Sequence, residues 1–176
     1  MNWEAFHHRG DVLHAVISEL AIRRDGTLPM ELPGVNETFR DELDLIGALQ
    51  LKWSARIQGW LEREFAAQPM EVEDAVIRAW RNTDAELAGV REVLDHYTAH
   101  PTSKPMADAL RRASVKERTM LAANAGRLSF LDAEEHGNKI GAEIEAKARD
   151  ERHVVAETPA EPVPSLRKRL KAAFAA

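Results

Sequence analysis

A regular stripe of large side chains between residues 76 and 97 most constrains how this chain can fold. Its members recur at alternating spacings of four and three: Val76, Trp80, Thr83, Leu87, Val90, Leu94 and Tyr97. Side chains at that spacing share one face of an α-helix, and the repeat is typical of a seam between two nearly parallel or antiparallel helices. We therefore predict one helix between Gln68-Pro69 and His100-Pro101, with Trp80 and Leu87 buried.

The same periodicity predicts helices through most of the chain and no strand of useful length. A first helix should end near Arg24, before Asp25-Gly26. Further helices are expected to begin at Asp41, at Pro105 and at Asp132, the last of them running to about Arg152. Ser114 and Glu117 have the spacing of a capping box, so we expect a new helix or a kink at Ser114. Five or six helices joined by short loops predict an all-α helical bundle over residues 1–154.

Composition places the chain among globular proteins. With 176 residues, 44% hydrophobic and 30% charged, it is long enough for one domain with a core. It has no cysteine, which excludes disulfides and thiolate metal sites. No apolar run approaches the ~20 residues of a transmembrane helix, and the N-terminus lacks the pattern of a secretory signal. A cytoplasmic protein is the expectation.

No short catalytic motif occurs, so we expect no catalytic residues and no cofactor. His96 and His100 have the spacing that places two imidazoles on one helical face. Pro101 disfavours helical geometry at His100, however, and we expect that shared face to be lost. The prediction is therefore no metal site. A metal-dependent helical-bundle enzyme is kept as a second alternative function.

Two further patterns can be explained either by packing within the protein core or by a functional site. The first is aromatic: Trp53, Trp60 and Trp80 lie on apolar stripes, which favours core packing over a ligand pocket. The second is a row of small residues at spacings of four, formed by Ala133, Gly137 and Gly141. Glycine inside a helix costs about 1 kcal/mol relative to alanine, so the row predicts close approach of another backbone. A tight hairpin with the preceding helix is favoured, and a self-association face that forms a homodimer is the alternative.

The C-terminal segment, residues 165–176, carries four positive charges and no acid. Subtracting them from the net charge of −5 leaves −9 on residues 1–164. Residues 155–164 contain three prolines and two acids and are expected to form an extended, semi-stiff linker. On a helical wheel the apolar side chains of the segment share one arc beside the basic ones. We predict that it binds a partner through Leu166, Arg167, Lys168, Arg169, Leu170, Lys171 and Phe174.

A basic amphipathic segment on an acidic body predicts a docking element. The acidic body argues against general nucleic-acid binding, which needs a concentrated basic surface. A dozen residues are too few for a stable isolated helix, so the segment should fold when it binds. The leading hypothesis is a non-enzymatic interaction protein, an adaptor or accessory subunit that docks on a protein partner through this segment.

Two resemblances supply alternatives. A first helix, an irregular region and then Phe39-Arg40-Asp41-Glu42-Leu43-Asp44-Leu45 resemble the junction into the fourth helix of TetR-type regulators. That resemblance implies a degenerate TetR-like helical transcription regulator. Residues 27–38, however, hold two prolines and no lysine or arginine, so the DNA-contacting chemistry of that family is absent there. A terminal peptide after a Pro-rich spacer is also similar to the cargo tags of encapsulin shells.

Overall fold

The computed structural model describes the backbone of residues 3–128 and 133–157, and the side-chain surroundings of residues 8–128 and 136–150. Within these ranges the protein is all-helical and has no strand, which confirms the predicted fold class. Seven helices occur, where five or six were expected. They are α1 (Trp3–Arg23), α2 (Val35–Thr38), α3 (Glu42–Ala66), α4 (Val72–Glu86), α5 (Val90–Ala99), α6 (Lys104–Asn124) and α7 (Ala133–Glu157).

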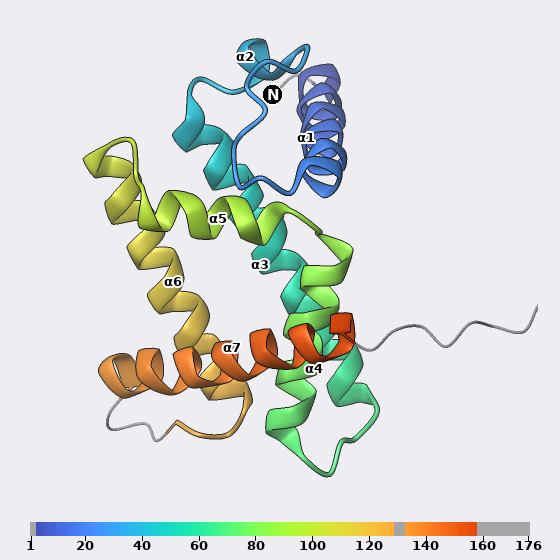
Figure 1. The fold of residues 1–176 in the computed structure, drawn as a ribbon, viewed down its shortest axis with the longest axis vertical. Coiled ribbons are helices and arrows are strands. Elements are labelled where there is room, and N and C mark those ends of the chain that lie inside the picture. Colours follow the sequence, from blue (N-terminus) through green and yellow to red (C-terminus); the bar gives the residue numbers. More distant parts are fainter. Residues whose placement is uncertain (1–2, 129–132, 158–176) are drawn as a thin grey trace, which may run out of the picture.

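The long helix α3 runs through the middle of the molecule (Figure 1). α4 packs against it, and α5 and α6 also contact it. In Figure 1, α5 and α7 lie across the direction of α6, while α1 and α2 gather near the N-terminal end of α3. α7 packs on both α6 and α4. The last helix therefore holds together two parts of the fold that are separate in the sequence.

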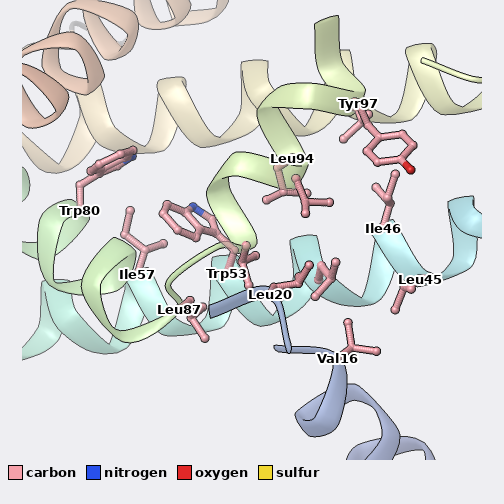
Figure 2. Packing of buried hydrophobic residues seen from close by; sticks show 14 of the residues in the cluster. Val16, Leu20, Leu45, Ile46, Trp53, Ile57, Trp80, Leu87, Leu94 and Tyr97 are labelled. Carbon is pink, nitrogen blue, oxygen red and sulfur yellow. The ribbon is translucent and has the colours of Figure 1, made fainter. Parts of the chain in front are cut away.

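The core is centred on two tryptophans. The Trp53 and Trp80 rings meet edge to face, with their centroids 5.6 Å apart, and neither side chain is exposed. Ile57 lies close to both rings in Figure 2. Trp80 and Leu87 are buried, as the stripe predicts. Aromatic pairs in this geometry add to the stabilisation that burial of their area supplies, so the stripe serves core packing.

The predicted single helix between Pro69 and Pro101 is wrong, because it is two helices, α4 and α5. Gly89 separates them and adopts a left-handed conformation with φ of +86°. A Cβ atom at this position would lie 2.0 Å from the carbonyl oxygen of Leu20 in α1. The break thus lets the backbone of α1 approach closely, while Leu87 and Val90 stay buried on either side of it.

The expected helix start or kink at Ser114 is also wrong. α6 is continuous and begins much earlier, at Ser103, whose hydroxyl accepts a hydrogen bond from the Met106 amide at 3.3 Å. Ser114 therefore lies in the helix interior. Glu117, the other half of the expected capping box, is buried instead of capping an end. By contrast, the predicted start at Asp41 is confirmed by its side chain, which accepts from the Asp44 amide at 2.8 Å.

Replacing Gly89 with alanine should destabilise the fold by at least about 2 kcal/mol, because the new side chain would occupy a left-handed conformation and collide with α1. Chemical denaturation measures this directly. Gly59→Ala in α3 is the matched control. A Cβ there meets nothing within 4 Å, so that change should stabilise by about 0.5–1 kcal/mol. Equal effects of the two changes would contradict the close approach of α1.

Candidate functional site

Six charged side chains gather where α5, α6 and α7 meet. We call them the charge cluster, and its members are Arg91, Asp95, Glu117, Arg118, Glu145 and Arg149. Charged side chains are rarely buried unless they are paired. Arg91, Glu117 and Glu145 are each less than a tenth exposed, so their pairing dominates this part of the fold.

Arg91, from α5, is the centre of the charge cluster. Its Nη1 donates to Glu117 Oε1 at 3.0 Å, and its Nε donates to Asp95 Oδ1 at 2.9 Å. Its Nη2 lies 3.4 Å from Glu145 Oε1. The guanidinium also lies over the Trp53 ring, 5.3 Å from its centroid. One planar group therefore contacts α3, α6 and α7 at once, a geometry that arginine supports and lysine does not.

Glu117, from α6, joins the charge cluster to the tryptophan core. Its Oε1 accepts from Trp53 Nε1 at 3.1 Å as well as from Arg91. The capping-box spacing predicts a capping role for Glu117, and its buried contacts with Arg91 and Trp53 correct that prediction. A signal was present, because Glu117 shares a helical face with Leu110 and Leu121, which are both buried. An acid on an apolar stripe indicates a buried partner.

The α7 side of the charge cluster is built on Glu145 and Arg149, one helical turn apart. Glu145 Oε2 accepts from Arg118 Nε at 3.0 Å, and its Oε1 accepts from Arg149 Nη2 at 2.5 Å. Arg149 Nη1 donates to Asp95 Oδ2 at 2.8 Å, and its guanidinium lies over the Trp80 ring. Glu145 is also one turn beyond Gly141, on the face that packs against α6.

The charges in the cluster balance. Burial acts to raise the pKa of Glu145, but the nearby guanidinium groups of Arg91, Arg149 and Arg118 outweigh it and hold that pKa below its ordinary value. Burial likewise acts to lower the pKa of Arg91, and its carboxylate partners outweigh it. Three basic side chains therefore face three acidic ones, and each acid is paired with at least one arginine. This saturated network is suited to fixing helix positions and leaves no unpaired acid for proton transfer.

A polar hollow of about 390 Å³ lies beside the charge cluster. Thr98 and Ser114 bring hydroxyl groups to its wall, and Ala142 and Ala146 bring small side chains. The space suits a small polar molecule in size. Its charged wall is already satisfied within the cluster, so a ligand there would have to compete with the ion pairs.

The histidine pair differs from expectation. His100 follows the end of α5 and has a non-helical backbone, as Pro101 predicts, but its amide still donates to the His96 carbonyl at 2.8 Å. The two rings therefore stay together, with their centroids 5.2 Å apart. The expectation that Pro101 separates them is wrong. Even so, the side chains that the structure describes include no group of three or more histidines and acids able to hold a metal ion.

The glycines of α7 are covered by the same chain. A Cβ at Gly141 would lie 2.0 Å from the carbonyl oxygen of Arg118, and one at Gly137 would lie 3.1 Å from Thr119 Cγ2. The close approach that these glycines predict therefore occurs between α6 and α7. Both glycines are buried in this contact, and the homodimer alternative stays a prediction. Ala133 begins α7, and its side-chain surroundings lie outside the described range.

Two other predictions concern the C-terminal segment and the TetR resemblance. The partner-binding residues, Leu166 to Lys171 and Phe174, lie outside the described residues. The segment that the TetR resemblance concerns, residues 24–41, is described throughout and contains a single helix of four residues, α2. A helix-turn-helix requires two helices. The segment therefore does not form the DNA-binding element that the resemblance implies.

Comparisons of the chain with protein-family profiles, with curated proteins and with solved structures found no match. The class to which it belongs thus rests on its own geometry. It is an all-α protein whose helices are tied together by a buried charge cluster. Among the described helices, none is long and apolar enough to cross a membrane.

Glu117→Ala should destabilise the protein by about 2–4 kcal/mol, because it leaves Arg91 Nη1 and the Trp53 indole N–H without their acceptor in a buried site. Replacing both ends together, as Arg91→Met with Glu117→Met, should cost less than this single change, since no unpaired charge remains between them. Urea unfolding measures both. Glu62→Ala, at an exposed position of α3, is the control and should stay within about 0.5 kcal/mol. If Glu117→Ala also changed the free energy of unfolding by no more than about 0.5 kcal/mol, the charge cluster would not stabilise the helix packing.

Acid should weaken the charge cluster through Glu145. Its pKa in the folded protein lies below the ordinary value of 4.5, so its contribution is complete above that pH and is lost as the pH falls through the folded pKa. The free energy of unfolding should therefore decline more steeply on acidification in the wild-type protein than in Glu145→Gln. Denaturation at a series of pH values tests this. Parallel curves would show that Glu145 is not stabilised by its arginines.

Proposed function

We propose that this chain is a non-enzymatic interaction protein, an adaptor or accessory subunit, that docks on a protein partner through residues 165–176. The observation that carries the proposal is the separation of charge along the chain. Four basic residues and no acid follow a Pro-rich linker, on a chain whose other residues sum to −9. The apolar residues of the segment, Leu166, Leu170 and Phe174, share one helical arc. Such a segment can fold as an amphipathic helix in the groove of a partner.

The helix that precedes the linker supports this proposal, because it is firmly held. Lys147 of α7 pairs with Glu73 of α4, and Arg149 pairs with Asp95 of α5. The described core residues lie between Val12 and Ala148, and α7 contributes Ile144 and Ala148 to them. A fixed stem followed by a semi-stiff linker would present a docking segment at a distance from the body.

Removing residues 165–176 should abolish partner binding and leave the fold intact, because the Pro-rich linker is expected to keep the segment out of the core. A pull-down that compares the full chain with a chain ending at Val163 identifies the partner, and a thermal melt checks folding. If the shortened chain unfolds, the segment belongs to the core. If it folds and still binds, the docking surface lies on the body.

Kinetics with the purified partner then separate the apolar from the basic contribution. Phe174→Ala and Leu170→Ala should chiefly speed dissociation, whereas Arg167→Glu with Lys171→Glu should slow association and weaken its salt dependence. Lys139→Glu, at an exposed position of α7, is the matched control for charge. A response to the charge changes alone, with a steep loss in salt, would instead indicate nucleic acid or an anionic membrane.

A further inference from the structure

A second surface, separate from the C-terminal segment, crosses α1, α3 and α6. Three adjoining hollows of about 820, 320 and 530 Å³ lie along it. The first and second share Gly47 and Leu51 of α3, and the second and third share Lys116 and Met120 of α6. They therefore form one continuous depression, which we call the α3 trough.

The first hollow of the α3 trough is mainly apolar, whereas Gln50, Ser54 and Gln58 line the second hollow together with Leu51 and Met120. Leu51, which lines both of these hollows, is 71% exposed, whereas the side chains of α3 that face the core, such as Leu45, Leu49 and Trp53, are buried. Leu13 of α1 and Leu43 of α3 line the first hollow and are only partly buried. At Gly47 the absence of a side chain keeps the floor open. An exposed apolar depression rimmed by charges marks an interaction site in a protein of this kind.

The rim of the α3 trough is basic. Lys52 and Lys116 are exposed, and neither forms an ion pair with any residue that the structure describes. Arg112 is exposed on the same face of α6. Three acids line the trough. Asp44 is paired with Arg9 and Arg40, Glu117 is paired with Arg91, and the exposed Asp41 caps α3 by accepting from the Asp44 amide, so only Asp41 offsets the rim cations. Unbalanced positive charge thus faces solvent here, on a chain whose net charge is −5.

We propose that the α3 trough is the docking site for an acidic amphipathic helix of a partner protein. A concave apolar floor accepts the leucine-type face of a helix, and the lysines on the rim attract its carboxylates. The chain's own C-terminal segment does not suit this site, because it carries four positive charges of its own. The two docking elements therefore serve different partners, and each can fail without the other.

The shape of the site favours a protein helix over a membrane or a nucleic acid. A bilayer takes up apolar side chains that project from a convex surface, whereas Leu51 lies in a depression. A nucleic-acid duplex would pair its phosphates with the lysines of the rim but leave the apolar floor exposed to solvent. A helix from a protein partner uses both features of the trough.

The test uses the full chain and a labelled synthetic peptide of about 18 residues, roughly five helical turns, with leucine on one face and glutamate on the other. A peptide with lysine in place of every glutamate is the charge-reversed control. Fluorescence anisotropy should show binding of the acidic peptide only. Leu51→Asp should weaken it roughly tenfold, as expected on loss of one buried anchor. Lys52→Glu with Lys116→Glu should weaken it and flatten its salt dependence.

Three control variants show where the peptide binds. Ile22→Asp alters a side chain that is 78% exposed outside the trough, and Lys139→Glu alters a lysine of α7. Arg167→Glu with Lys171→Glu alters the C-terminal segment. All three should bind the acidic peptide as the wild type does, and thermal melts confirm that every variant is folded.

Several outcomes would overturn the proposal. These are equal binding of the two peptides, no loss with Leu51→Asp, and loss only on changing the C-terminal segment. Failure of the acidic peptide to bind, combined with Leu51-dependent binding to phosphatidylserine vesicles or Lys52-dependent binding to a DNA duplex, would assign the trough to those ligands instead. None of these results affects docking through residues 165–176, which is measured with a different partner.

Discussion

Arg91 and Glu117 form an ion pair at the point where α3, α5, α6 and α7 come together, and the placement of those helices depends on it. Taking two charges out of water costs several kcal/mol for each ion, and their attraction offsets this only when the geometry is good and the remaining donors are satisfied. Here Trp53, Asp95 and Glu145 supply that satisfaction. A shift of one helix along another would leave a buried charge without its partner.

The value of this arrangement therefore lies in specificity. Apolar contacts along α6 and α7 tolerate sliding, because one small or aliphatic side chain can replace another at the interface. Gly141 limits that freedom by bringing α7 onto the backbone of α6 at Arg118, and the Arg118 side chain then reaches Glu145 one turn along α7. The close backbone approach at Gly141 and the Arg118–Glu145 ion pair therefore favour the same position of α7 along α6. Arg149 extends the selection to α5 and covers the Trp80 ring.

Features that depend on neighbouring residues were predicted well from the sequence, whereas features that depend on contacts between distant helices were not. Asp41 marks a helix start through its own side chain, which caps α3, and Pro69 restricts its own backbone, so the local sequence was sufficient at both places. The break at Gly89 depends on a carbonyl of α1, which no local pattern contains. Glu117 fits a capping box locally, yet its partner Arg91 lies 26 residues away in another helix. The apolar stripe around Glu117 did hold the information, but a capping pattern on the same residues concealed it.

The α3 trough could not be predicted from sequence for a related reason. Leu51, Lys52, Lys116 and Met120 each resemble an ordinary exposed position of an amphipathic helix, and only the packing of α3 beside α6 assembles them into one surface. That packing is set by Glu117, which accepts from Trp53 of α3 on the side facing the core. Glu117 belongs to the charge cluster and also lines the middle hollow of the trough, so the two features meet at the same contact between α3 and α6. Any change that lets α3 and α6 separate at the cluster would also open the floor of the trough, so the buried ion pair determines the shape of the surface available for docking.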